Sequence, residues 1–249
     1  MLVPQTIRRQ SQRCLAILMT TLLIACSTTT PATSIPETSI PATPIPATPL
    51  QLAQLPYDIS TLPATWTTLD LNGWPANRYQ PIHIFGTEYD GKIEPTLMFD
   101  FLPVGGEVRA PFDGRVLEVR DQAESCDSEM YLLPTNEDPN YPSVSLDHVI
   151  PLDNLRTKGA TFKAGDVIAT LGKWECKEDF ARFELMVLAQ TAQGLQSECP
   201  LRLLSQPIAS TTDTQIKEIM QSWNALNPPS PYPPDVLQNG ICALPYTQP

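Results

Sequence analysis

From about residue 55 onward, the chain carries short runs in which apolar and polar residues alternate, separated by residues typical of turns. The clearest runs cover residues 81–85, 96–102, 108–110, 115–119, 143–150, 166–171 and 180–188. Successive side chains of a β-strand point to opposite faces of a sheet, so this alternation predicts strands. Many short strands divided by turns predict a mainly β domain, folded as a compact antiparallel β-sandwich or barrel-like core.

One of these runs predicts the environment of a histidine. Within residues 143–150, Val144, Leu146, His148 and Ile150 fall on one face of the expected strand, and Asp147 falls on the other face. We therefore expect His148 on the apolar face of its strand. A partly buried, hydrogen-bonded structural histidine is the common outcome there, rather than a metal ligand or a catalytic base.

Helical periodicity is clear in one segment, residues 212–226. Its apolar positions recur at the spacing of one helix face and are Ile216, Ile219, Met220 and Trp223. Ser210, Thr211 or Thr212 is available as N-cap, and Pro228 with Pro229 ends the segment. The pattern predicts one C-terminal helix, within a terminal region that we assign to residues 208–249.

The N-terminal segment has the features of an export signal. Arg8, Arg9 and Arg13 precede an apolar run over residues 14–25, which is too short to cross a bilayer core. The run ends in Leu-Ile-Ala followed by Cys26, which resembles the bacterial lipobox. We expect a lipoprotein signal peptide over residues 1–25 and a mature chain that begins at acylated Cys26, its attachment to the lipid bilayer. The alternative is a short transmembrane anchor with an incidental cysteine.

The segment after Cys26 reads as a spacer. Residues 27–50 repeat the unit Ile-Pro-(Glu/Ala)-Thr with almost no charge. Proline at this density favours extended polyproline II conformation and opposes a packed core. We therefore expect a disordered Pro/Thr-rich tether over residues 26–52, which leaves residues 53–207 for the β domain.

Charge excludes one class of partner. The chain has 16 Lys and Arg residues against 27 Asp and Glu residues, and its formal net charge is −11. Loss of the three arginines of the signal segment makes the mature chain more acidic still. Such a surface repels nucleic acid, so we expect no nucleic-acid partner.

Four cysteines remain in the expected mature chain beyond Cys26: Cys126, Cys176, Cys199 and Cys242. An even number of cysteines outside the cytoplasm predicts two disulfides, for which three pairings are possible. We favour Cys126–Cys176, which would join two loops of the β domain, and Cys199–Cys242, which would hold the C-terminal tail. A zinc site is the alternative, but the spacings are long and lack a Cys-x-x-Cys pair.

Residues 94–188 resemble the β core of the lysostaphin/LytM-type zinc endopeptidases, which cut peptide cross-links in peptidoglycan. Five motifs appear in the order of that family. Residues 94–101 are similar to the strand with H-x-G-x-D-F, residues 106–116 to G-x-x-V-x-A-P-x-D-G-x-V, and residues 144–148 to v-x-I-x-H. Residues 163–172 are similar to K-x-G-d-x-I-g-x-x-G, and residues 180–185 stand where the family has H-L-H-F-E-V.

The same resemblance implies that the zinc site is lost. The positions of the three zinc ligands carry Thr96, Asp100 and Arg182, and Phe180 stands at the position of a catalytic histidine. An arginine side chain has no lone pair to give to a metal. We therefore expect no metal, no cofactor and no catalysis. Asp100, His148, Phe180, Arg182 and Glu184 would line the former groove, and Arg182 would pair with Asp100 in place of the zinc.

The resemblance implies a degenerate domain, exposed outside the cytoplasm on the bacterial cell envelope. Such a domain would bind peptidoglycan or regulate a cell-wall hydrolase. Two alternatives stay open. One is an active zinc endopeptidase with atypical ligands. The other is a biotinyl/lipoyl-like structural module of the efflux-adaptor type, which the motifs of residues 106–116 and 163–172 would also suit.

Overall fold

In the computed structural model, the residues described are 50–62, 80–86, 88–89, 92–93, 95–135, 143–191, 194–226 and 232–242. The expected signal peptide, Cys26 and nearly all of the tether lie outside these residues. Leu50 and Leu52, which end the expected tether, are buried, and Leu52 forms a bridge with Leu204. The chain therefore joins the folded domain slightly earlier than the sequence predicts.

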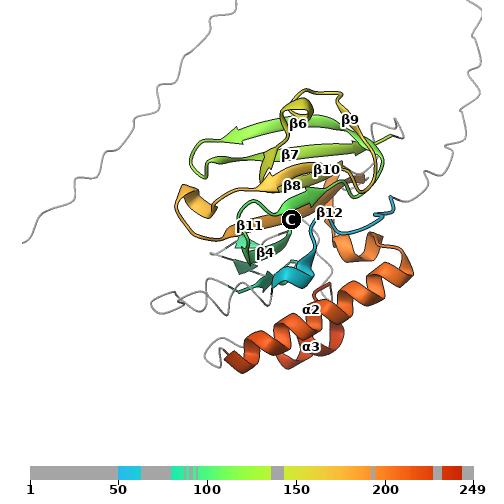
Figure 1. The fold of residues 1–249 in the computed structure, drawn as a ribbon. Coiled ribbons are helices and arrows are strands. Elements are labelled where there is room, and N and C mark those ends of the chain that lie inside the picture. Colours follow the sequence, from blue (N-terminus) through green and yellow to red (C-terminus); the bar gives the residue numbers. More distant parts are fainter. Residues whose placement is uncertain are drawn as a thin grey trace, which may run out of the picture. The chain divides into compact units, whose positions relative to one another are not determined.

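The domain is mainly β, as expected (Figure 1). The strands are β1 (Ile82–His83), β2 (Glu88–Tyr89), β3 (Lys92–Ile93), β4 (Leu97–Leu102), β5 (Glu107–Arg109), β6 (Gly114–Gln122), β7 (Asp127–Pro134), β8 (Ser143–Pro151), β9 (Thr161–Phe162), β10 (Val167–Leu171), β11 (Ala181–Thr191) and β12 (Gly194–Glu198). Short 3-10 turns cover Ile59–Thr61, Asp153–Leu155, Trp174–Cys176 and Pro200–Leu203. The α-helices are α2 (Gln206–Leu226) and α3 (Pro234–Asn239).

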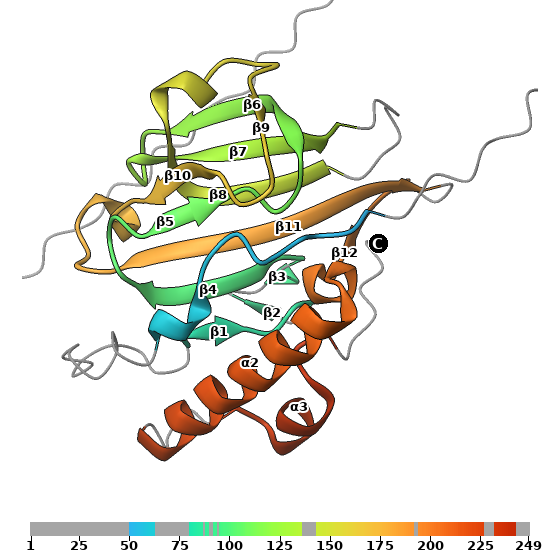
Figure 2. The same ribbon diagram turned by 45° about the vertical axis from the view of Figure 1, so that its right-hand side comes forward.

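Ten of the strands form one antiparallel sheet, whose main path runs β1-β4-β11-β8-β7-β6-β9. Strand β10 pairs with both β5 and β8, and β12 pairs with β11. In Figure 2 the long strand β11 runs through the middle of the sheet, between β4 and β8. This central strand carries the residues that resemble the family's H-L-H-F-E-V motif, so it places them among neighbours on both sides.

One face of the sheet forms the hydrophobic core. Facing residues of β4, β11, β8 and β7 supply its apolar side chains, which include Leu97, Phe99, Phe183, Leu185, Val144, Leu146, Met130 and Leu132. Helix α2 packs against the core through Ile216, Ile219, Met220 and Trp223, the four residues expected from its periodicity. The Trp223 ring stacks on Phe101 of β4 with centroids 5.8 Å apart.

Helix α2 begins earlier than the sequence predicts. It starts at Gln206, so the three residues expected to cap it lie inside the helix. Hydroxyl groups are tolerated there because they bond back to the preceding turn: Thr211 Oγ1 donates to the Pro207 carbonyl and Thr214 Oγ1 to the Ser210 carbonyl. Among the described residues, no helix combines the length and apolar character needed to cross a membrane.

Both expected disulfides are present, Cys126–Cys176 and Cys199–Cys242. The first joins the turn before β7 to the turn that precedes β11. The second joins the segment after β12 to the segment after α3. Each closes a long loop, with sequence separations of 50 and 43 residues.

Candidate functional site

The register of the strands gathers polar residues on the sheet face opposite the core. Glu184 of β11 lies across from Met98 of β4 on one side and from Asp147 of β8 on the other. Directly opposed residues of neighbouring strands share a face, and so do residues two apart on one strand. We call this surface the charged face, and its polar residues include Thr96, Asp100, Arg182, Glu184, Asp147 and Glu129.

Asp100 and Arg182 form the ion pair expected from the sequence. Arg182 Nε lies 2.6 Å from Asp100 Oδ1, and Arg182 Nη2 lies 3.1 Å from Asp100 Oδ2. The two side chains are 0% and 3% exposed, so the contact is shielded from water. A bidentate contact of this kind matches the fork of the guanidinium to the two carboxylate oxygens.

Two further side chains complete this buried group. Nε2 of His83 lies 2.8 Å from Asp100 Oδ2, and the ring of Trp174 lies 4.0 Å from the Arg182 guanidinium carbon in a cation–π contact. Burial is the largest influence on the pKa of Asp100 and would raise it. The charges of Arg182 and His83 outweigh burial, so the pKa of Asp100 lies below its ordinary value.

The residues at the family's three zinc positions do not fit a zinc ion. Thr96 offers a hydroxyl group where the family has an imidazole. The Thr96 hydroxyl instead donates to Glu184 Oε2 at 3.4 Å. Both oxygens of Asp100 accept from cationic or ring nitrogens, and Arg182 offers no lone pair. The structure therefore places Arg182 in contact with Asp100, and its guanidinium occupies the carboxylate that a metal would need.

A second group forms on the same face around His148. Its Nδ1 lies 3.0 Å from Asp127 Oδ2, and its Nε2 lies 3.5 Å from Glu184 Oε1 and 3.9 Å from Asp147 Oδ2. One ligand atom from each of Asp147, His148 and Glu184 lies within 4.8 Å of the others, a spacing that could hold a metal ion.

The expected place of His148 on the apolar face is wrong. Its backbone has a φ of 62°, in the left-handed region, and the pairing of β7 with β8 shifts between Ser128 and Met130. This irregularity turns the imidazole toward Asp147 and Glu184. Val149 becomes buried and Ile150 becomes exposed, the reverse of the expected alternation. The expectation of a partly buried and hydrogen-bonded side chain agrees with its 12% exposure.

The carboxylates that crowd around His148 shift the pKa values of this group. Burial is the largest influence on the pKa of His148 and would lower it, but contacts with Asp127 and Glu184 and the charge of Asp147 raise it to about 10. Burial, together with the neighbouring Glu184 and Glu129, raises the pKa of Asp147 to about 6. The carboxylates around His148 therefore stabilise a positive charge on or beside its imidazole.

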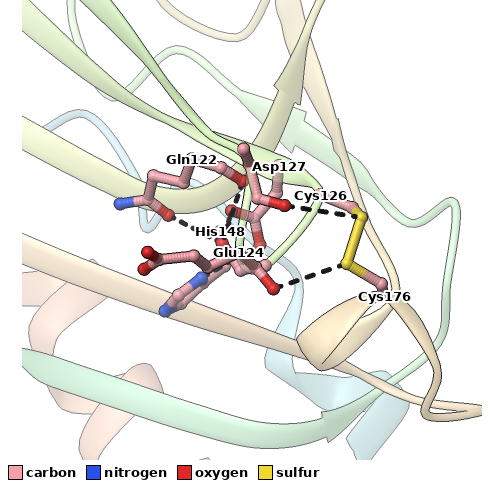
Figure 3. The surroundings of a disulfide bond; sticks show 8 residues. Gln122, Glu124, Cys126, Asp127, His148 and Cys176 are labelled. Atoms are coloured by element: carbon pink, nitrogen blue, oxygen red, sulfur yellow. Dashed lines mark hydrogen bonds and ion pairs between the residues drawn. A yellow bond between two sulfur atoms is a disulfide. The ribbon is translucent and has the colours of Figure 1, made fainter. Parts of the chain in front are cut away.

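A short turn that is fixed by a disulfide lies beside both the Asp100–Arg182 pair and the group around His148. Trp174 precedes Cys176 in the turn Trp174–Cys176, and its ring meets the His148 ring edge-on with centroids 4.5 Å apart. Figure 3 shows the Cys126–Cys176 disulfide beside the contact between Asp127 and His148. The disulfide thus holds the residue before Asp127 and the turn that carries Trp174 next to each other.

Phe180, expected to fill part of the former groove, is 1% exposed and packs 5.2 Å from the ring of Phe101. Phe101 in turn stacks on Trp223, so Phe180 belongs to an aromatic cluster that reaches helix α2. A hollow of about 640 Å³ lies elsewhere, lined by Gln54, Tyr57, Arg109 and other residues outside the charged face. The charged face therefore remains the candidate site, because it gathers the ionisable groups at the positions that resemble a catalytic family.

Sequence reasoning missed three residues of this site: His83, Asp127 and Trp174. His83 belongs to a run that was predicted as a strand, but alternation does not reveal which strand pairs with it. Asp127 and Trp174 lie beside Cys126 and Cys176, so the favoured disulfide was a signal that these segments meet. Nothing in the pattern indicates that Trp174 covers Arg182.

No family model matches the chain, and no curated protein matches it. Among solved structures it is similar to lysostaphin, with 16% identity and a TM-score of 0.38 over 49% of each chain, so it spans about half of that protein. It is similar to LytU, with 20% identity and a TM-score of 0.36 over 46% of this chain and 77% of the other. A zinc-containing peptidase from Vibrio cholerae gives 18% identity and a TM-score of 0.37, over 56% of this chain and 37% of the other. Lysostaphin and LytM-type peptidases are the family that the motifs resemble.

Proposed function

We propose that this chain is a lipid-anchored protein of the bacterial cell envelope whose β domain is a non-catalytic counterpart of the LytM-type endopeptidases. The observation that carries the proposal is the buried ion pair between Asp100 and Arg182. By the motif resemblance, a guanidinium stands where the last zinc-ligating histidine of the family would be. A catalytic zinc needs three ligands and an open position for water, and an arginine supplies neither.

The location outside the cytoplasm is supported by two independent features. The first is the export segment that ends at Cys26, with its charged start, short apolar run and lipobox-like end. The second is the pair of disulfides, which persist in oxidising compartments. A domain held on a membrane by a proline-rich tether would face the cell wall, so peptidoglycan or a cell-wall hydrolase is the partner that we propose.

Hydrolysis is tested by incubating the processed full-length protein with isolated cell-wall sacculi and added Zn²⁺. We expect no release of soluble peptide fragments. Release that depends on Arg182 or Asp100 would overturn the non-catalytic assignment. An active enzyme with atypical ligands is a second candidate, favoured by the grouping of Asp147, His148 and Glu184. Release that is abolished by Glu184→Gln would establish that candidate instead.

The role of Arg182 in place of a metal can be tested by restoring a ligand. Arg182→His would set a second imidazole beside Asp100, opposite His83, and we expect this variant to gain one bound Zn²⁺. Arg182→Gln is the matched control, because it removes the charge without adding a ligand. Both variants are made in a His148→Gln background, so that zinc held by the His148 group is not counted. A folded Arg182→His variant that gains no zinc contradicts the proposed correspondence.

Wall binding is tested by co-sedimentation of the detergent-solubilised protein with sacculi. We expect the protein in the pellet, and expect the same protein to remain soluble after the sacculi are digested. A protein that stays in the supernatant with intact sacculi would exclude direct wall binding. In that case, a change in the rate at which a purified cell-wall hydrolase digests sacculi would test the regulatory role.

A further inference from the structure

We infer that Asp147, His148 and Glu184 form a binding site for a divalent cation of the zinc class, distinct from the position closed by Arg182. Asp147 and His148 are neighbours on β8, and Glu184 lies directly across from Asp147 on β11. The site is thus built on two paired strands in the middle of the sheet. It goes beyond the proposed function, since binding a metal here requires neither wall binding nor hydrolysis.

The separations between the ligand atoms suit an ion between them. Zinc lies about 2.0–2.2 Å from nitrogen and oxygen ligands, so two ligands of a tetrahedral site are about 3.3–3.6 Å apart. His148 Nε2 lies 3.5 Å from Glu184 Oε1 and 3.9 Å from Asp147 Oδ2. Both separations exceed the usual N–H···O hydrogen-bond distance of about 2.9 Å. All three ligand atoms lie within 4.8 Å of one another, so small movements of the side chains would bring them onto a metal ion.

The other polar atom of each residue is already held by a separate partner. His148 Nδ1 contacts Asp127, and Asp147 Oδ1 accepts the backbone N–H of His148 at 2.8 Å. Glu184 Oε2 accepts from the Thr96 hydroxyl. These contacts aim Nε2, Oδ2 and Oε1 at one another. Outer partners that orient ligands in this way, above all a carboxylate on the far nitrogen of a histidine, are typical of metal sites.

The tautomer of His148 follows from Asp127. An ionised carboxylate only accepts hydrogen bonds, so Nδ1 carries a proton and the neutral ring presents a lone pair at Nε2. That lone pair faces the carboxylate oxygens of Asp147 and Glu184, so a cation placed between the three atoms would be attracted by all of them.

Local charge and access also favour a cation. Asp127 joins Asp147 and Glu184 around the imidazole, and Glu129 adds a fourth carboxylate near Asp147. Arg120 reaches Glu129 at 3.9 Å from an exposed position. The side chains of His148, Glu184 and Asp147 are 12%, 13% and 23% exposed. The site is therefore shielded on most sides but open enough for an ion to enter with a water molecule as fourth ligand.

The test measures Zn²⁺ bound by the processed full-length protein after chelator treatment and dialysis. We expect one Zn²⁺ per chain, lost in His148→Gln and in Glu184→Gln. His83→Gln is the matched control, because it removes the other histidine of the chain and should keep the zinc. Asp127→Asn, which leaves all three ligands in place, should weaken binding by about 10–100-fold.

Absence of stoichiometric zinc in the wild-type protein, or binding by His148→Gln as tight as wild type, overturns the inference. Circular dichroism establishes that each variant is folded. If a variant does not fold, the ring signals of His148 in the wild-type NMR spectrum decide the question. They should shift on addition of Zn²⁺, and signals that do not respond would refute the site. Failure here leaves the Asp100–Arg182 pair and the wall-binding proposal intact.

Discussion

Arg182 is a buried cation, and the carboxylate of Asp100 neutralises its charge. The ring of Trp174 packs against the face of its guanidinium. Breaking a buried ion pair leaves a desolvated charge, which costs more than removing both charges. Each of the two buried charges is therefore stable in the interior only because the other charge neutralises it.

The first prediction follows from that dependence. Asp100→Asn should lower the free energy of unfolding by about 3–5 kcal/mol, because Arg182 stays buried without its carboxylate. The double variant Asp100→Asn/Arg182→Gln should lose less than Asp100→Asn alone. Urea denaturation of the wild type, both single variants and the double variant gives the coupling energy. Losses that simply add would show that the two side chains do not neutralise each other.

The second prediction concerns pH. The pKa of Asp100 is lower in the folded protein than its ordinary value of 3.8, so its contribution to stability is present above that value and is lost as the pH falls through the folded-state pKa. The difference in unfolding free energy between wild type and Asp100→Asn should thus be constant near neutral pH and shrink below about pH 4. A difference that persists unchanged at pH 2 would contradict this assignment.

The Asp100–Arg182 contact was predictable because the motif resemblance places both residues at positions that would hold one zinc ion. The sequence could not predict that His83 joins them, since strand register is set by the whole sheet. It predicted the wrong face for His148 because a single left-handed residue reverses the alternation beyond it. Such a conformation is uncommon for a residue other than glycine.

At the scale of elements, the turn Trp174–Cys176 depends on a covalent link. Glu175 and Cys176 both have positive φ, and the Cys126–Cys176 disulfide holds this turn next to the start of β7. The turn carries Trp174 onto His148 and Arg182. Its position therefore depends on a cross-link as well as on packing.

The third prediction compares the two disulfides. Replacing both cysteines of either bridge by alanine should lower the free energy of unfolding by about 2–4 kcal/mol. Only the Cys126→Ala/Cys176→Ala variant should also change the NMR signals of His148, because only that bridge borders the charged face. The Cys199→Ala/Cys242→Ala variant is the matched control. Equal changes at His148 in both variants would argue against a local effect.

Most strands on the sheet's main path were predictable, because a half-buried strand alternates along its length. Strand β7 was missed although it alternates between buried and partly buried residues. Its sequence contains Asp127, Ser128 and Glu129, which weaken the apolar signal. The start of α2 was missed because a Ser-Thr-Thr run usually marks a cap, and here the hydroxyl of Thr211 in that run bonds within the helix.

At the scale of the whole molecule, the sequence predicts a charged leader, a lipid-accepting cysteine, a proline-rich spacer and a folded domain. Only the last of these lies among the described residues, in which Leu50 is already buried and helix α2 starts at Gln206. The division itself stays a prediction, made from the sharp change in proline density and apolar content along the chain.

The fourth prediction tests the anchor. Cys26→Ser should abolish lipidation, because the thiol is the acceptor of the diacylglycerol, and the variant should accumulate as an unprocessed precursor. Wild-type protein should partition into the detergent phase, whereas the variant should lack the added acyl mass. Detergent phase separation measures the partitioning, and intact-mass spectrometry measures the acyl mass. A wild-type chain without acyl mass would remove the basis for envelope anchoring.

The side chain of Tyr232 bonds to the backbone of strand β1. Its hydroxyl accepts the N–H of Ile82 and donates to the carbonyl of Ile82, which are the outward backbone groups of the edge strand β1. An open strand edge is a template on which a second polypeptide can extend the sheet. Tyr232 therefore occupies this edge in the described part of the chain, and we expect a chain truncated before Tyr232 to aggregate through β1.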